Sequence, residues 1–154
     1  MAARLDIAIE PVPVDAAPAI VALIERVVLD SVDATDAEKQ TFLANIRANL
    51  DQWVRDPASG LHLKADAAGR LVGVVLVKGF SNLCHLFVAP DHQRQGIGRA
   101  LLQAAVNGCR GQAPTPRLRL NAAKNAVGFY ERMGWRRIVD AAPADSATRF
   151  ELIL

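Results

Sequence analysis

The chain has 154 residues, of which 51% are hydrophobic, and its formal net charge at pH 7 is +2. This length suits one domain with a substantial core, so we expect residues 1–154 to form a single domain. No apolar run approaches the ~20 residues that a membrane helix needs, and the N-terminus lacks the apolar block of a signal peptide, so we expect a cytoplasmic protein. Cys84 and Cys109 have no metal-ligand or CxxC spacing, which predicts free thiols and no metal site.

Charge is distributed unevenly along the chain. Residues 1–91 carry 8 Lys/Arg and 12 Asp/Glu, a net charge of −4, and residues 92–154 carry 10 and 4, a net charge of +6. The basic second half favours an anionic cofactor, and the acidic first half favours a cationic substrate. Nucleic-acid binding is disfavoured, because aromatic residues that would stack on single-stranded bases are not interleaved with the basic residues.

The first part of the chain predicts a strand followed by two helices. Apolar and polar residues alternate over 5–10, which indicates a strand. Apolar positions over 20–28 follow helical spacing, and Thr35 with Glu38 forms a capping-box pattern for a second helix. Four acidic residues, Asp30, Asp33, Asp36 and Glu38, surround the start of this second helix and are suited to attract an amine. For Asp36 and Glu38 we favour another explanation, which is that they cap the helix and complement its dipole.

Three strands are expected next. Residues 61–65 alternate, and residues 71–77 and 83–88 are apolar throughout, which is typical of strands buried on both faces. Strand alternation places the side chain of His85 on the opposite face from that of Asn82, as a core histidine. His62 is expected to face solvent.

The remainder predicts a helix, a strand, a helix and two strands. Their ranges are 97–108, 117–120, 126–133, 135–139 and 149–154. The expected order is βααβββαβαββ, an α/β (α+β) fold with a mixed, mostly antiparallel central sheet and helices on both faces.

A glycine-rich turn before the third helix points to an anionic ligand. The first N–H groups of a helix lack partners within it, and the helix dipole adds positive charge there, so this end binds phosphate. Gly96 and Gly98 permit close approach and unusual dihedral angles, and Arg94 and Arg99 add charge. The dinucleotide fingerprint GxGxxG fails because Leu101 stands at the third glycine, and GxxxxGK[ST] has no match.

Two segments resemble motifs of one enzyme family. The strand ending Leu86-Phe87-Val88-Ala89-Pro90 and the QxxGxG pattern of Gln93 to Gly98 resemble the acetyl-CoA-binding motif of the GNAT superfamily of N-acetyltransferases. Asn121 to Trp135 resembles the family segment NxxAxxFYxxxGF, with Trp135 in place of Phe. The resemblance covers essentially the whole chain. It implies the GNAT fold and transfer of the acetyl group of acetyl-CoA to a primary amine of a small molecule or peptide, by direct attack in a ternary complex.

The resemblance also implies how acetyl-CoA is held. Two neighbouring strands, here 83–88 and 117–120, splay apart, and the pantetheine arm inserts between them on backbone groups of Phe87 and Val88. Asn125 is expected to bond the pantetheine or its strand. The expected cofactor-binding residues are Leu86, Phe87, Val88, Gln93, Arg94, Gln95, Gly96, Ile97, Gly98, Arg99, Asn125 and Tyr130.

Tyr130 matches the family tyrosine beside the cofactor sulfur and is expected to be the general acid for the leaving thiolate. Some members place a glutamate base at the position of Asn82. An amide accepts no proton at neutral pH, so we expect a water held by Asn82 or by a backbone carbonyl to relay the proton, with His85 as the alternative base. A rival function is an acyl-CoA-binding sensor or interaction module without turnover. Exposed strand edges would permit a homodimer.

Overall fold

Seven strands form one sheet in the order β1-β2-β3-β4-β5-β7-β6 in the computed structural model, which describes residues 6–138 and 147–154. The strands are β1 (Ile7–Pro11), β2 (Gly60–Ala67), β3 (Arg70–Lys78), β4 (Asn82–Val88), β5 (Arg117–Ala123), β6 (Arg136–Arg137) and β7 (Ala147–Ile153). The helices are α1 (Ala17–Ser31), α2 (Asp36–Arg55), α3 (Ile97–Cys109) and α4 (Val127–Arg132). This order confirms the predicted βααβββαβαββ arrangement.

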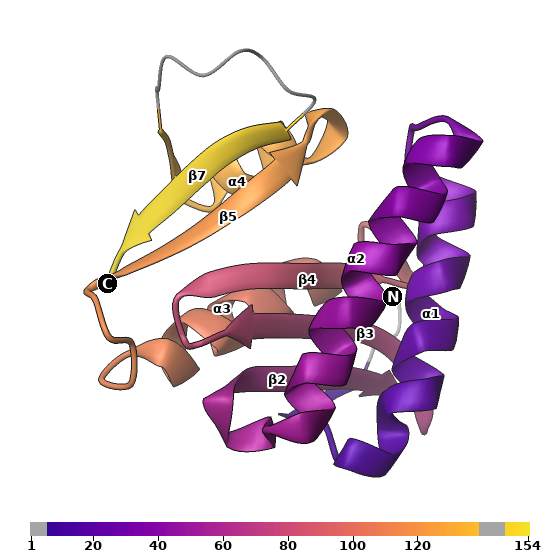
Figure 1. Cartoon of the computed structure of the whole chain (residues 1–154), viewed down its shortest axis with the longest axis horizontal. Coiled ribbons are helices and arrows are strands. Elements are labelled where there is room, and N and C mark those ends of the chain that lie inside the picture. Colours follow the sequence, from indigo (N-terminus) through magenta and orange to yellow (C-terminus); the bar gives the residue numbers. More distant parts are fainter. Residues whose placement is uncertain (1–5, 139–146) are drawn as a thin grey trace, which may run out of the picture.

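Helices cover both faces of the sheet. In Figure 1, α1 and α2 lie in front of β2, β3 and β4, and α3 lies behind them. Alternation along β3 divides its side chains between these layers. Gly73 faces α3, where an added Cβ would lie only 2.8 Å from Leu101 Cδ1. Leu76 faces α2 and lines a small surface pocket with Trp53.

Local sequence signals account for the ends of several elements. Thr35 caps α2, and its hydroxyl accepts a hydrogen bond from the backbone N–H of Glu38 at 3.2 Å. Ala68 and Gly69 join β2 to β3, both with positive φ angles of 49° and 77°, as a two-residue hairpin turn requires. β6 is shorter than the predicted strand 135–139, of which Val139 lies outside the described residues, and β7 begins two residues before the predicted strand 149–154.

β4 contains a bulge that the sequence pattern does not show. Leu76 on β3 pairs with His85, but the next residue, Val77, pairs with Leu83, so Cys84 has no partner in the register. An extra residue reverses the alternation of side chains beyond it. Asn82 pairs with Lys78, and its side chain therefore shares the α2 face with that of His85. The predicted placement of these two residues on opposite faces is wrong.

His62 is also placed differently from the expectation. It is 4% exposed, and its ring lies edge-on against that of Trp53 with centroids 4.4 Å apart. Alternation along β2 directs the side chain of His62 away from α3, but α2 covers the face to which it points. The prediction that His62 faces solvent is therefore wrong.

β4 and β5 are the only parallel neighbours in the described sheet, and they pair over two positions. Asn82 pairs with Arg119 and Leu83 with Leu120. Beyond this point β5 diverges from β4 and pairs with β7 along its whole length. Figure 1 shows β5 and β7 rising away from β4, with α4 packed behind them. No helix in the described part of the chain is long and apolar enough to cross a membrane.

Candidate functional site

The divergence of β4 from β5 leaves backbone groups of β4 without a strand partner. The N–H of Ala89 donates to the carbonyl of Val72 on β3 at 2.7 Å. Successive residues of a strand direct their backbone groups to alternate sides. Phe87, two residues earlier, therefore points its backbone at β3, and Leu86 and Val88 point theirs into the opening. The backbone groups of Phe87, which were expected to hold the pantetheine, therefore face β3, and those of Leu86 and Val88 face the opening.

The side chain of Phe87 contributes to the other side of the opening. Its ring lies edge-on to that of Phe42 on α2, with centroids 6.3 Å apart. Phe42 is 42% exposed, which is high for a phenylalanine. These rings give the α2 side of the opening an apolar wall, which the sequence analysis did not anticipate because the two residues are far apart in the chain.

The glycine turn before α3 contains two residues with left-handed backbone conformations. Arg94 and Gly96 have φ angles of 61° and 83°, both in the left-handed region. Gly96 caps α3, and its carbonyl accepts from the N–H of Ala100 at 3.0 Å. The N–H groups at the start of α3 have no partner within the helix. Arg94, Gln95 and Arg99 are exposed around them, and Ile97 is buried.

Gly98 is the point at which the two sequence motifs meet. A Cβ added there would lie 3.6 Å from Val88 Cγ2 and 3.9 Å from Phe129 Cζ. The end of β4, the first turn of α3 and α4 therefore converge on the same place. Asn125 is exposed in the 3-10 turn that leads into α4.

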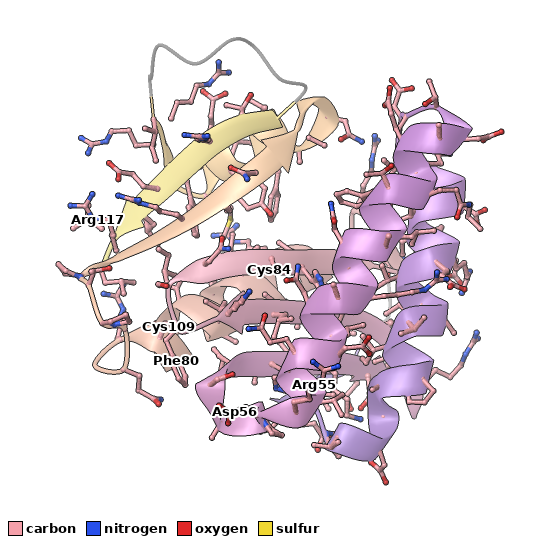
Figure 2. All side chains as sticks on the ribbon, in the orientation of Figure 1. Arg55, Asp56, Phe80, Cys84, Cys109 and Arg117 are labelled. Carbon is pink, nitrogen blue, oxygen red and sulfur yellow. The ribbon has the colours of Figure 1, made fainter. Side chains whose placement is uncertain are left out.

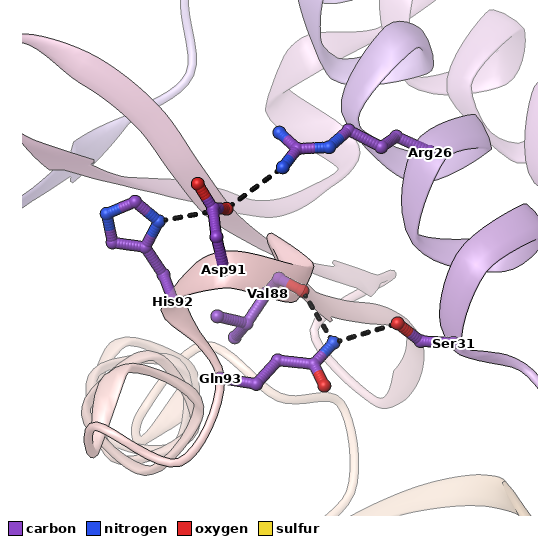
Figure 3. A network of polar contacts seen from close by, with 6 residues as sticks. All are labelled: Arg26, Ser31, Val88, Asp91, His92 and Gln93. Atoms are coloured by element: carbon purple, nitrogen blue, oxygen red, sulfur yellow. Dashed lines mark hydrogen bonds and ion pairs between the residues drawn. The ribbon is translucent and has the colours of Figure 1, made fainter.

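Side chains from α1 hold the loop that precedes α3 (Figure 3). Gln93 Nε2 donates to the carbonyl of Val88 at 3.0 Å and to Ser31 Oγ at 3.4 Å. Arg26 pairs with Asp91 at 3.0 Å, and His92 Nδ1 lies 3.1 Å from the same carboxylate. These neighbours hold the pKa of Asp91 below its ordinary value. Sequence reasoning missed Ser31 and Arg26, because their partners lie more than 60 residues away and no local pattern marks them.

Tyr130 lies in an aromatic cluster on the inner side of β5 and β7. Its ring contacts those of Phe129, Trp135 and Phe150, with centroid distances of 5.1, 5.9 and 5.8 Å. The residue is 6% exposed, and burial raises the pKa of its phenol well above the ordinary value. The hydroxyl has no hydrogen-bond partner among the described residues, yet it is not one of their fully buried unpaired polar atoms. It is thus a neutral donor that keeps some access to solvent.

The side chains of His85 and Cys84 on β4 are also uncharged at neutral pH. His85 is 1% exposed, neither ring nitrogen has a partner in the described structure, and burial lowers its pKa to about 3. Burial also raises the pKa of the Cys84 thiol. Cys84 and Cys109 are free, as predicted, and the described residues contain no group of three or more His, Cys, Asp or Glu side chains that would hold a metal.

Comparisons with known proteins identify the family. The family model described as "Acetyltransferase (GNAT) domain" matches residues 30–147. The chain is 36% identical over 110 residues to the peptidyl-lysine N-acetyltransferase YjaB of Salmonella typhimurium, covering 69% of this chain and 70% of that protein. It is 33% identical to YjaB of Escherichia coli over the same length, covering 69% of each.

Solved structures share the fold. The PaiA N-acetyltransferase of Thermoplasma acidophilum, solved in complex with coenzyme A, superposes with a TM-score of 0.77 at 19% identity, covering 97% of this chain and 100% of that one. A GCN5-related N-acetyltransferase from Rhodopseudomonas palustris gives a TM-score of 0.76 at 22% identity, covering 100% and 99%. The chain belongs to the GNAT superfamily and is an acetyl-CoA-dependent N-acetyltransferase.

Proposed function

We propose that this enzyme acetylates the side-chain amine of a lysine in a peptide or protein, by direct attack of the amine on the thioester in a ternary complex. The observation that carries the proposal is the opening between β4 and β5, which pair only at Asn82–Arg119 and Leu83–Leu120. The curated relatives are named peptidyl-lysine N-acetyltransferases, which supports lysine as the acceptor.

The chain offers two sets of groups that suit the cosubstrate. The backbone groups of Leu86 and Val88 face the opening and match the amides of a pantetheine arm. The carbonyl of Val88 already accepts from Gln93, so binding there requires sharing or exchange of that hydrogen bond. The free N–H groups after Gly96, with Arg94 and Arg99 beside them, suit a pyrophosphate.

The amine is proposed to enter from the opposite face. Val88 packs towards α3 and Gly98, on the side of the cosubstrate loop, so the α2 face is left for the acceptor. Asp30 near the end of α1 and Asp33 in the connection to α2 are exposed and attract a cation. The apolar wall of Phe42 and Phe87 suits the aliphatic stem of lysine.

Direct attack is favoured over an acetylated enzyme. Cys84 is the cysteine on β4, and its raised pKa keeps it a thiol, whereas the thiolate is the nucleophilic form. Tyr130 is protonated over the physiological range and suits donation of a hydrogen bond to the leaving sulfur. Because its pKa is raised, complete proton transfer from the phenol is less favourable than stabilisation of the thiolate by that hydrogen bond.

Asn82 stands at the position where some members of the superfamily have a glutamate base, and it has no carboxylate to accept a proton. We propose that the side-chain amide of Asn82 positions a water that removes the amine proton. His85 now lies on the same face as Asn82, but burial keeps it neutral with a lowered pKa of about 3, which makes it a weak base. A lysine amine with a pKa of ~10.4 is about one part in a thousand neutral at pH 7, so the rate is expected to rise with pH.

The test is an initial-rate study with a lysine peptide and acetyl-CoA. Direct attack gives intersecting double-reciprocal lines, and mass spectrometry should locate the acetyl group on the side-chain nitrogen. Parallel lines, with an acetyl group on the enzyme, would overturn direct attack. Acetyl-CoA binding by calorimetry without thiol release on any amine would instead support the sensor function.

A further inference from the structure

One row of paired residues crosses five strands and carries three cationic side chains and one carboxylate. The register joins Lys78 on β3 to Asn82 on β4, then to Arg119 on β5, Glu151 on β7 and Arg136 on β6. Residues paired in register share one face of a sheet. Lys78 lines the pocket beneath α2, so the whole row lies on the α2 face.

Two further arginines extend this row into a basic face. Arg117 lies two residues before Arg119 on β5, and Arg149 lies two residues before Glu151 on β7, so both share the face of the row. The intervening residues, Leu118 and Phe150, are fully buried on the other side. We define the basic sheet face as Arg117, Arg119, Arg136, Arg149 and Glu151.

The basic sheet face is open to solvent. Arg119, Arg136 and Arg149 are exposed, and the side chain of Arg117 is 42% exposed. Figure 1 shows β5 and β7 standing clear of α1 and α2, and Figure 2 shows Arg117 at the outer end of β5, on the side of the molecule away from these helices.

Positive charge on this face exceeds what its one carboxylate balances. Glu151 pairs with Arg136 at 2.7 Å and with Arg117 at 3.5 Å. Arg136 and the neighbouring arginines hold the pKa of Glu151 below its ordinary value, so it is ionised at neutral pH. Setting Arg149 aside, the three guanidinium groups of Arg117, Arg119 and Arg136 face one carboxylate among the described residues, which leaves an excess of two positive charges.

Binding of the cosubstrate does not account for this charge. Arg94 and Arg99 lie at the start of α3, on the opposite side of the sheet. The basic sheet face begins at Arg119, where β4 and β5 part, and it borders the side from which the amine is proposed to enter. Its charge is therefore presented to the acceptor.

We propose that the basic sheet face docks an acidic segment that flanks the acceptor lysine of a peptide or protein substrate. The proposal rests on the lysine acetylation proposed above and adds a preference for aspartate or glutamate near the target. Arg117 and Arg119 are two residues apart in β5, about 7 Å, the spacing of alternate side chains in an extended peptide. Guanidinium groups pair well with carboxylates at such an exposed site.

A single-stranded nucleic acid fits the same face less well. None of the described residues that define the face is aromatic, and base stacking on aromatic side chains is a main source of affinity for single strands. Glu151, at the centre of the arginines, also repels a continuous phosphate backbone. Binding of RNA is therefore included as one possible outcome of the test.

The experiment compares two lysine peptides that differ only in flanking residues, one with Asp and Glu and one with Asn and Gln. Calorimetry with the full chain measures peptide affinity without acetyl-CoA, and a separate assay measures KM and kcat for each peptide. We expect the acidic peptide to bind about tenfold more tightly. The difference should shrink as ionic strength rises from about 0.05 M to about 0.5 M.

Variants locate the effect. Arg117→Gln with Arg119→Gln should abolish the preference for the acidic peptide through KM, with kcat little changed, whereas Arg117→Lys with Arg119→Lys should keep most of it. Arg70→Gln with Arg110→Gln is the matched control, because it removes the same charge outside the basic sheet face. Thermal unfolding verifies that each variant folds.

The outcomes separate the two proposals. Equal affinity for both peptides, with lysine acetylation observed, overturns the acidic docking and leaves the proposed function intact. Selective binding of the acidic peptide without acetylation keeps the docking surface and overturns the function. Tighter binding of a single-stranded RNA oligonucleotide than of the acidic peptide also overturns the proposal.

Discussion

The ring of Trp53 stands edge-on to the ring of His62, with centroids 4.4 Å apart. This contact buries the imidazole of His62 beneath α2. His85 lies on the same face of the sheet, two strands away, because His62 on β2 and His85 on β4 both pair with Leu76 on β3. Neither ring nitrogen of either histidine has a partner in the described structure. A charge on either ring is therefore strongly disfavoured in the folded protein.

Acid should destabilise the protein through these two histidines. Burial lowers the pKa of His62 to about 4 and that of His85 to about 3, from an ordinary value of 6.5. The unfolded chain therefore binds protons more tightly, so stability is complete above pH ~6.5 and falls as the pH decreases towards 3–4. The loss is on the order of 3 kcal/mol for each histidine. Urea unfolding at several pH values measures it.

Removal of the titrating groups gives the control for the acid effect. His62→Leu with His85→Leu should flatten the dependence of unfolding free energy on pH between about 6.5 and 4. His92→Gln removes an imidazole near the surface and should keep most of the acid loss. An unchanged slope in the double variant would contradict the assignment.

The two glycines of the turn should respond differently to alanine. Gly96 has a φ angle of 83°, so alanine there should cost about 1–2 kcal/mol of stability. A Cβ on Gly98 meets only ordinary contacts, the nearest at 3.6 Å, so Gly98→Ala should fold normally. Because that Cβ would occupy the space proposed for the pyrophosphate, we expect acetyl-CoA affinity to fall about tenfold.

Calorimetry with acetyl-CoA and thermal unfolding together separate these effects. Normal acetyl-CoA affinity in a stable Gly98→Ala protein would show that the pyrophosphate binds elsewhere. Ala104→Gly, in the interior of α3, offers a stability control that leaves the first turn of the helix unchanged.

Tyr130→Phe should separate the hydroxyl from the packing of the ring. The hydroxyl has no hydrogen-bond partner among the described residues, so its removal should change the unfolding free energy by less than about 0.5 kcal/mol. If the phenol donates to the leaving sulfur, kcat should fall about 100-fold or more, with little change in KM for acetyl-CoA. Steady-state kinetics measures both.

Trp135→Phe serves as the comparison, because it alters the same aromatic cluster and keeps the hydroxyl. It should lower stability more than it lowers kcat. A Tyr130→Phe enzyme with kcat within about twofold of the unaltered protein would remove the phenol from the mechanism.

Cys84→Ala tests whether the β4 thiol takes part in the reaction. Its raised pKa and its place in the bulge predict packing rather than catalysis. We expect kcat to remain within a few-fold of its original value and no acetyl group to appear on the enzyme during turnover. Loss of activity by about 1000-fold, together with an acetylated Cys84 in the unaltered enzyme, would favour a two-step mechanism.

The order of the elements follows from features that act over a few residues. Hydrophobic periodicity marks the helices, the Thr35 cap starts α2, and the glycine at position 96 starts α3 in the conformation that its lack of a side chain permits. These signals predicted the order of the elements and the glycine turn before α3 correctly, because each depends on nearby sequence.

The orientation of β4 depends on its neighbours, and alternation alone misplaced it. The bulge at Cys84 becomes visible only when the strand is aligned with β3, and it moves Asn82 to the face of His85. The burial of His62 likewise depends on Trp53, nine residues earlier in a different element. The single-domain organisation and the roles of the site residues stay predictions.

The narrow junction between β4 and β5 has a mechanical consequence. Only two residue pairs in the described sheet join β5 and β7 to β4, so these two strands can move relative to the remaining strands. A ligand that filled the gap between β4 and β5 would restrict this movement. Amide hydrogens that face the gap, such as that of Leu86, would then exchange with solvent more slowly. Substrate binding would therefore make the junction between β4 and β5 more rigid.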